Sequence, residues 1–175
     1  MYENSLKYKD YNIILIVAAS ENNVIGNGGK IPWRISEDLK RFNDVTRGHK
    51  VVMGRKTYYS LPEKYRPLPE RENIILSRSE DLKKNANIQV FSSIDDVLKY
   101  VEDEKTFIIG GESVYKDFMD YAKMLDITRV HRSVEGDTFF PEVDYNLWKL
   151  VCQESLTEYG KDYLENFSHL IYLRK

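Results

Sequence analysis

The sequence predicts one α/β domain with a central, mostly parallel sheet, flanking helices and an antiparallel hairpin at one edge. Short apolar runs alternate with amphipathic segments along most of the chain, which is typical of parallel strands joined by helical crossovers. Near the C-terminus, two longer strand-like runs follow each other around a polar turn, and this order predicts a hairpin. A chain of 175 residues is long enough for one domain with its own core.

The expected elements follow in order along the chain. The parallel strands are the apolar runs at residues 13–19, 51–53, 74–76, 107–109 and 125–130. The helices, with apolar side chains three and four residues apart, are residues 37–45, 56–61, 94–101 and 113–122. The hairpin strands are residues 148–156 and 166–173, with residues 159–162 as the turn. Three prolines predict a surface loop at residues 62–69, and residues 1–11 are an expected N-terminal extension to a domain at residues 12–175.

The first expected helix carries an apolar stripe. Leu39, Phe42 and Val45 lie on one face, so Arg41 is expected to face outward. Ser36, just before the pattern begins, is the expected N-cap.

Charge and cysteine content exclude several classes of protein. The 26 Lys and Arg nearly balance the 28 Asp and Glu, for a net charge of −2, whereas dedicated nucleic-acid binders usually carry a basic excess. One cysteine, Cys152, allows no disulfide within the chain, and the three histidines are far apart, unlike zinc ligands. No apolar run approaches the ~20 residues of a membrane span. We therefore expect a cytoplasmic protein with no metal, no membrane contact and no nucleic-acid partner.

One expected strand end combines a glycine with groups that suit an anion, at the edge where parallel sheets bind ligands. Gly54 permits a sharp turn, and Arg55, Lys56 and Thr57 open the next helix. Backbone N–H groups, positive charge and a hydroxyl there suit a phosphorylated ligand. A capped helix with two solvated cations explains the motif equally well. It is not a Walker A loop, because Arg55 interrupts the contiguous Gly-Lys-Thr.

Two further strand ends and one loop carry ligand-like features. Ser77-Arg78 could hold a phosphate oxygen, although an exposed arginine is the simpler interpretation. Gly110-Gly111 lets a ligand lie against bare backbone, which resembles a dinucleotide turn without the full glycine pattern; a tight turn alone is the alternative. Residues 24–33 hold three glycines followed by Pro32-Trp33, a pattern typical of a mobile lid or of a flexible connector.

Asp38 stands on the apolar side of the first helix, four residues before Phe42. An acid in a first helical turn is ordinarily a partner of the helix dipole. A carboxylate on the buried side, however, needs a donor or keeps its proton to higher pH, which makes it useful in proton transfer near neutral pH. From spacing alone, the structural interpretation is slightly favoured.

Together, these motifs closely resemble the dihydrofolate reductase family. The ordered set is Ile31-Pro32-Trp33, Asp38 with Phe42, residues 52–57, residues 66–77, Ile109-Gly110-Gly111 and Glu135-Gly136-Asp137-Thr138. The likeness runs from about Ile13 to the C-terminus, and the set is highly specific although no single motif is. The resemblance implies an oxidoreductase that uses NADPH to reduce 7,8-dihydrofolate to 5,6,7,8-tetrahydrofolate, which supplies one-carbon metabolism. It also implies a monomer and a target of antifolates.

The resemblance also implies roles on the substrate side. Asp38 would bind the 2-amino group and N3 of the pterin and favour protonation of N5 through water ordered by Trp33, while hydride passes to C6. Thr128 matches the threonine that hydrogen-bonds this carboxylate. Arg71 matches the arginine that holds the α-carboxylate of the glutamate tail, although neighbouring glutamates could pair with it instead. The residues expected at the substrate are Val17, Ile31, Asp38, Leu39, Phe42, Leu68, Arg71, Ile109 and Thr128.

On the cofactor side, the resemblance assigns the pyrophosphate to Lys56 and Thr57. Arg55 and Arg78 would face the 2′-phosphate and adenine, which favours NADPH over NADH. The remaining expected cofactor contacts are Ala18, Ile25, Gly26, Gly54, Leu76, Ser77, Gly110, Gly111, Glu112, Ser113, Val114 and Tyr115. In the family, the peptide between the two glycines is cis, and a Gly-Asp-Thr loop steadies the lid.

The chain departs from the family pattern at Glu112, where many relatives have a third glycine. An acid beside phosphates is unexpected, and two outcomes stay open: its carboxylate points outward, or it weakens cofactor binding. Two other functions stay open: a reductase of a related pterin or pyrimidine substrate, and a non-catalytic nucleotide-binding module. Arg71 speaks against the first, because such substrates lack the glutamate tail, and the second has no use for Asp38.

Overall fold

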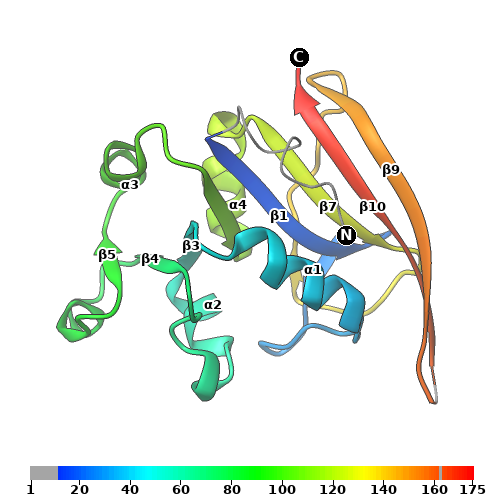
Figure 1. Cartoon of the computed structure of the whole chain (residues 1–175), viewed down its shortest axis with the longest axis horizontal. Helices are drawn as coiled ribbons and strands as arrows, with labels where there is room; N and C mark the ends of the chain where they lie inside the picture. Colours follow the sequence, from blue (N-terminus) through cyan, green and yellow to red (C-terminus); the bar gives the residue numbers. More distant parts are fainter. Residues whose placement is uncertain (1–11, 162) are drawn as a thin grey trace.

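The computed structural model describes residues 12–161 and 163–175, so the expected N-terminal extension lies outside the described residues. An eight-stranded sheet with the order β5-β4-β3-β6-β1-β7-β10-β9 forms the centre of the molecule (Figure 1). The parallel strands are β1 (Ile13–Ser20), β3 (Lys50–Gly54), β4 (Glu72–Leu76), β5 (Gln89–Phe91), β6 (Thr106–Gly110) and β7 (Met124–Val130). All five predicted parallel strands are confirmed. The sequence did not predict β5, which has three residues and little buried apolar surface.

The C-terminal hairpin is confirmed and is longer than predicted. Strand β9 (Trp148–Tyr159) pairs antiparallel with β10 (Leu164–Arg174), and β10 pairs antiparallel with β7. The hairpin therefore forms one edge of the sheet and brings the last strand beside the centre of the domain.

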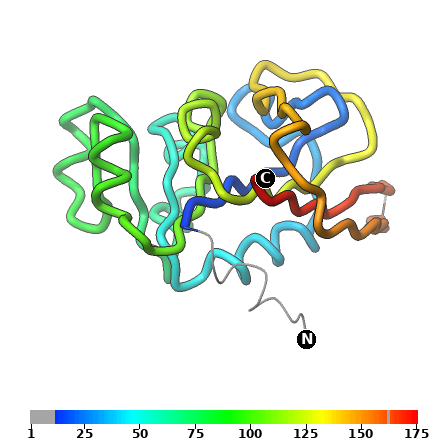
Figure 2. Tube along the Cα trace, turned by 90° about the horizontal axis from the view of Figure 1, so that it is seen from above, coloured from blue at the N-terminus to red at the C-terminus, as the bar shows by residue number. Residues whose placement is uncertain are grey.

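Four helices cover the two faces of the sheet: α1 (Ser36–Thr46), α2 (Arg55–Ser60), α3 (Ile94–Val101) and α4 (Glu112–Phe118). Side chains of α1 and α2 pack in one apolar cluster, and those of α3 and α4 pack in another. Figure 2 shows α1 and α4 on opposite sides of the sheet. Because both faces are covered, residues of β1 such as Ile14 and Leu15 are fully buried, which explains the continuous apolar run.

One predicted helix boundary and one predicted loop need correction. The helix expected at residues 113–122 ends at Phe118 and continues as a 3₁₀ turn, Met119–Tyr121, because the N–H of Ala122 is shared between the carbonyls of Phe118 and Met119. The proline-rich loop contains one regular turn, Glu63–Tyr65, also 3₁₀.

A small second sheet lies beside the main one. Strands β2 (Val24–Gly26) and β8 (Thr138–Phe139) pair antiparallel. Beyond β2, residues 27–30 form a tight turn closed by two backbone hydrogen bonds of 2.8 and 3.1 Å between Asn27 and Lys30. Gly28 and Gly29 have positive φ angles, as such a turn requires. No helix in the described part of the chain is long and apolar enough to cross a membrane.

Candidate active site

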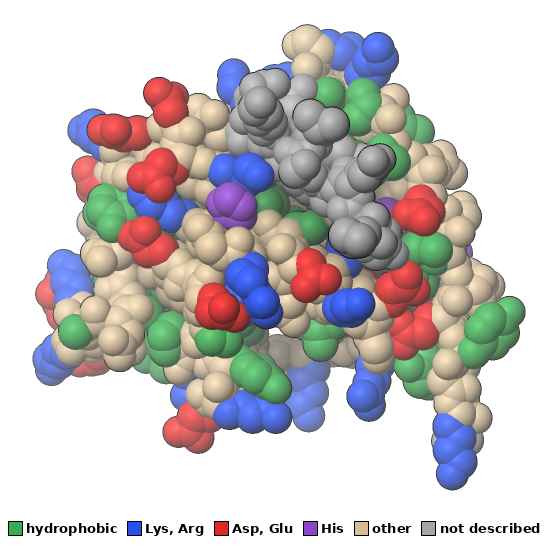
Figure 3. Space-filling view, in the orientation of Figure 1, with side chains coloured by type: hydrophobic (Ala, Val, Ile, Leu, Met, Phe, Trp, Pro, Cys, Tyr) green, Lys and Arg blue, Asp and Glu red, His purple; other side chains and the backbone are tan. Residues whose placement is uncertain are grey.

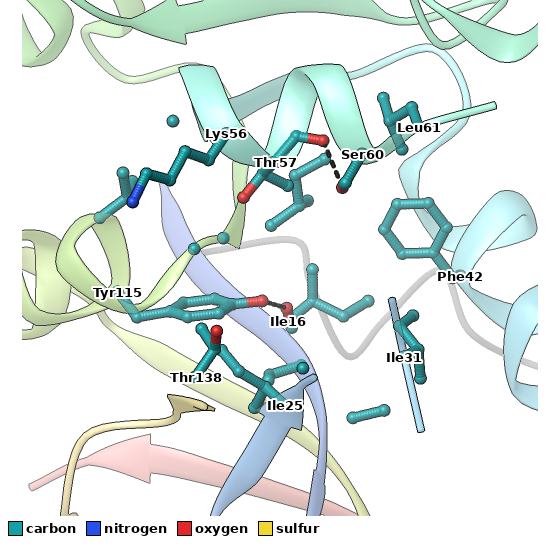
Figure 4. A pocket seen from close by; sticks show the side chains of 18 of the residues that line it. Ile16, Ile25, Ile31, Phe42, Lys56, Thr57, Ser60, Leu61, Tyr115 and Thr138 are labelled. Atoms are coloured by element: carbon teal, nitrogen blue, oxygen red, sulfur yellow. Dashed lines mark hydrogen bonds between the residues drawn. The ribbon is translucent and has the colours of Figure 1, made fainter. Parts of the chain in front are cut away.

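The carboxyl ends of the parallel strands open into a cleft of about 2050 Å³. Its walls come from the ends of β1, β3, β4 and β6, from α1 and α2, and from the first turn of α4. Figure 4 shows the apolar side chains of Ile31, Phe42 and Leu61 at one end and Lys56 at the other. The cations at the second end are Arg55, Lys56 and Arg78, and Figure 3 shows that Lys and Arg side chains gather along the lower edge of the molecule. One end of the cleft is therefore basic. We call the other the apolar end, after Ile31, Phe42 and Leu61, although Lys40, Asp44 and Arg47 also line the cleft.

All but two of the predicted site residues line this cleft. The exceptions are Leu68, which is buried in the cluster beneath α1 and α2, and Arg71. The Arg71 guanidinium donates to Asn43 Oδ1 at 2.9 Å, and Asn43 lines the cleft. Arg71 therefore lies one side chain behind the wall, and its role toward a carboxylate stays a prediction.

The Asp38 carboxylate is at the apolar end and is 20% exposed. The hydroxyl of buried Thr128 donates to its Oδ1. Nearby, the hydroxyl of buried Tyr115 donates to the carbonyl of Ile16 at 2.8 Å (Figure 4). Burial, and then the negative charge of Asp38, raise the pKa of Tyr115. Asp38 therefore has the donor that a partly buried carboxylate needs, and Tyr115 remains neutral and keeps its proton.

The start of α1 corrects the predicted cap. Ile35 occupies the N-cap position and offers no side-chain acceptor, and Ser36 is already helical. The missing acceptor comes from β9: the carboxylate of Glu158 accepts from the backbone N–H groups of Ser36 and Glu37 at 2.9 Å each, and from the hydroxyl of Tyr163 at 2.9 Å. Burial raises the pKa of Glu158, but these hydrogen bonds outweigh it and the pKa is lowered. The hairpin thus caps the helix that carries Asp38.

A second contact fixes α1 halfway along. Arg41, predicted to face outward, instead forms an ion pair with the fully buried Asp126 of β7, at 2.7 Å between Nη2 and Oδ2. The Arg41 side chain is 11% exposed. The outward prediction was wrong because a buried carboxylate on the sheet needs a cation, and α1 supplies it.

At the basic end, the cleft wall is bare backbone. Gly110 has φ +125, a conformation that L side chains rarely adopt, and a Cβ on Gly111 would lie 3.1 Å from Thr57 Oγ1. The peptide between them is cis, as the resemblance implied. Arg55, Lys56 and Arg78 flank this wall. Backbone N–H groups and cations here suit the phosphates of a nucleotide.

The turn at residues 27–30 is tied to the loop before β8. The Asp137 carboxylate accepts from the N–H of Gly28 at 2.9 Å and from the hydroxyl of Thr138 at 2.8 Å, and both bonds lower its pKa. Glu112 accepts from the N–H of Phe139 at 3.0 Å. Its carboxylate therefore binds the backbone of β8, while Glu112 also lines the cleft, and its effect on cofactor binding stays a prediction.

Sequence reasoning missed several residues of the site. Ser60 and Leu61 line the cleft opposite Phe42 (Figure 4), and the one signal for Leu61 was an apolar residue between a helix and Pro62. Glu158 gave no signal, and neither did His169, whose Nε2 is 3.5 Å from Asp38 Oδ1. Within the described residues, no group of three His, Cys, Asp or Glu side chains is arranged to hold a metal ion.

The fold and the cleft define a nucleotide-dependent α/β enzyme that pairs a basic, glycine-walled end with a half-buried carboxylate, Asp38, held by Thr128 at the apolar end. The family model described as dihydrofolate reductase matches residues 12–174. The chain belongs to the dihydrofolate reductase family.

Relatives span most of the chain. It is 38% identical to a dihydrofolate reductase of Bacillus subtilis over 164 residues, covering 93% of this chain and 95% of the relative. The one from Staphylococcus haemolyticus is also 38% identical, over 90% of this chain and 93% of the relative. The one from Neisseria gonorrhoeae is 44% identical over 78% and 83%.

A solved structure, the dihydrofolate reductase of Enterococcus faecalis complexed with NADP(H) and RAB-propyl, is also similar. It has a TM-score of 0.84 and 32% identity, covering 94% of this chain and 99% of that one. The predicted fold is confirmed.

Proposed function

We propose that this chain reduces 7,8-dihydrofolate to 5,6,7,8-tetrahydrofolate with NADPH and a proton. The observation that carries the proposal is the place of Asp38: a carboxylate with a threonine donor at the apolar end of a cleft whose other end is basic. Such a cleft fits a flat heterocycle beside a nucleotide. Membership of the family supports the same reaction, and a non-catalytic nucleotide-binding module would have no use for Asp38.

The basic end fits NADPH. The glycine pair leaves a cradle that a Cβ would fill, since Gly111 lies against Thr57. Lys56 and Thr57 would hold the pyrophosphate, and Arg55 and Arg78 the 2′-phosphate. NADPH, when bound, supplies the hydride, and the protein provides binding and orientation.

Asp38 binds and polarises the substrate in this proposal. Its carboxylate accepts hydrogen bonds from the 2-amino group and N3–H of the pterin, while Thr128 fixes its orientation. Its negative charge favours protonation of N5 through water, as hydride arrives at C6. Phe42, Ile31 and Leu61 keep bulk water from the ring (Figure 4).

Substitution of Asp38 by Asn tests the proposal. Asn keeps the size of the side chain but not the charge, so turnover of dihydrofolate at neutral pH should fall about a hundredfold or more, while NADPH binding is retained. Turnover is followed by the near-ultraviolet absorbance of NADPH, and NADPH binding by fluorescence titration.

The matched control is Asp95→Asn, which makes the same change in the first turn of α3, and it should turn over as the wild type does. Unchanged turnover in Asp38→Asn would remove Asp38 from its role. NADPH binding without oxidation by the wild type would favour the nucleotide-binding module.

We also propose that the protein acts as a monomer in the cytoplasm. A single cysteine suits a reducing compartment. Sedimentation of the full chain at several concentrations would test the monomer, since a dimer would double the mass.

A further inference from the structure

A buried histidine lies directly behind the proposed acid. His169 on β10 pairs in register with Thr128 and is 4% exposed. Its Nε2 is 3.5 Å from Asp38 Oδ1, the same oxygen that accepts from Thr128. This buried nitrogen has no hydrogen-bond partner among the described residues, and His169 does not line the cleft. The ring therefore faces the carboxylate from the protein side, where it cannot contact substrate.

The other charged groups on this face leave Asp38 as the charge next to the ring. On α1, Asp38 lies 3.5 Å from the ring, and the nearby cation Arg41 is paired with Asp126 of β7 at 2.7 Å. From β9, exposed Glu154 is its register partner. On β10 itself the neighbour is the Phe167 ring, at 5.4 Å between centroids. Among these groups, Asp38 is the one whose charge a proton on His169 would compensate at ion-pair distance.

We propose that His169 is a positioning residue that pairs with Asp38 when its ring is protonated. This pairing would lower the rate of hydride transfer at acidic pH, an inference that rests on the proposed function. A neutral ring leaves the full negative charge of Asp38 to act on the pterin. A protonated ring places a positive charge against the same oxygen and cancels part of that field. Histidine changes charge between about pH 5 and pH 8, so the opposition grows as the solution becomes more acidic.

Single-turnover hydride transfer in His169→Gln tests this pairing. Gln keeps a polar amide near the position of Nε2 but cannot take up a proton. With saturating NADPH and dihydrofolate, the ratio of variant to wild-type rate should rise about three- to tenfold as the pH falls from about 8 to about 5. The control is His131→Gln, because the wild-type His131 ring contacts Ser168 and Glu21 instead of Asp38. The ratio of its rate to the wild-type rate should not change with pH.

An NMR titration of the histidine rings provides a second test that needs no activity. The chain has three histidines, so the His169 signal is assigned by its loss in His169→Gln. If the two side chains pair, the pH at which the His169 signal changes should differ between Asp38→Asn and the wild type, because the protonated ring has lost its counter-charge.

The two measurements separate the possible failures. An inactive wild type would contradict the proposed function but not the pairing, which the titration still decides. A flat rate ratio in an active His169→Gln, or a midpoint that stays in place in Asp38→Asn, would overturn the pairing and leave the reductase intact.

Discussion

The two ends of the cleft are built from different parts of the chain. The basic end consists of two strand-to-helix junctions, β3 to α2 and β6 to α4, and the end of β4, where residues next to each strand supply the backbone and the cations. The apolar end joins α1 to strands far away in sequence. Asp38 contacts Thr128, 90 residues on, and Glu158 caps Ser36 from 122 residues on.

The two ends also differ in how charge is used. Arg55 and Arg78 at the basic end are exposed and available to a ligand. Behind the apolar end, buried or half-buried polar groups engage one another, as in Arg41 with Asp126 and His169 beside Asp38. The difference indicates that the basic end provides affinity for phosphate, whereas the apolar end holds one carboxylate in a fixed place and state.

After Asp38→Asn, removal of both arginines at the basic end should have the largest effect. In Arg55→Ala with Arg78→Ala, kcat/KM for NADPH should fall about a hundredfold, because each hydrogen bond to a charged group contributes about 1.5–3 kcal/mol and exposure reduces the sum. Values for NADH, which lacks the 2′-phosphate, should change little.

Steady-state kinetics with each cofactor give the ratio of kcat/KM for NADPH to kcat/KM for NADH. Arg47→Ala, at the other end of the cleft, is the control. An unchanged NADPH to NADH ratio in the double variant would remove the phosphate role from these residues.

The bare backbone at the basic end should give the next largest effect. In Gly110→Ala, a side chain at φ +125 is strained by about 1–3 kcal/mol, and relief of that strain shifts the cofactor wall. NADPH affinity should fall about tenfold, as measured by fluorescence titration, with a smaller change in KM for dihydrofolate.

Gly48→Ala is matched to it, with φ +75 and nothing within 4 Å of the added Cβ, outside the cleft. Both variants should unfold at lower temperature, but only Gly110→Ala should lose NADPH affinity. Equal NADPH affinity in the two variants would mean that Gly110 is required for folding and not for cofactor binding.

The contrast between the two ends also explains what the sequence could predict. The junctions at the basic end are local, so Gly54-Arg55-Lys56-Thr57 and Gly110-Gly111 could be recognised directly and assigned to one edge of the sheet. Apolar runs likewise predicted the strands, because burial on both faces leaves a continuous signal. Short strands such as β5, with little buried surface, left none.

The apolar end depends on strand register, which the sequence does not state. His169 faces Asp38 only because it pairs with Thr128, and a slip of one residue would turn it to the other face. Arg41 was placed outward by the helical stripe alone. One signal was available, since Asp126 stands in an apolar strand and a buried carboxylate requires a cation.

Loss of the cap on α1 should have the smallest effect on turnover and a clear effect on stability. Glu158→Ala leaves two N–H groups of α1 without their acceptor, which should lower the free energy of unfolding by about 1–2 kcal/mol. Glu158→Gln keeps one acceptor oxygen and should lose about half as much.

Because α1 carries Asp38, KM for dihydrofolate in Glu158→Ala should rise a few-fold while NADPH affinity is unaffected. Denaturant unfolding, KM for dihydrofolate and NADPH affinity separate these outcomes, with Gln153→Ala, an exposed residue on the same strand, as the control.

The pH dependence of that stability loss identifies the charge of Glu158 as its source. The hydrogen bonds of the cap lower the pKa of Glu158 in the folded protein, so its contribution is complete above the ordinary pKa of glutamate and disappears as the pH falls through the lowered value. The difference in unfolding free energy between wild type and Glu158→Ala should therefore be largest near pH 7 and shrink toward about pH 3. A difference that stays constant over this range would mean that the side chain acts through packing, and the long-range electrostatic support of the apolar end would then rest on Arg41 and His169.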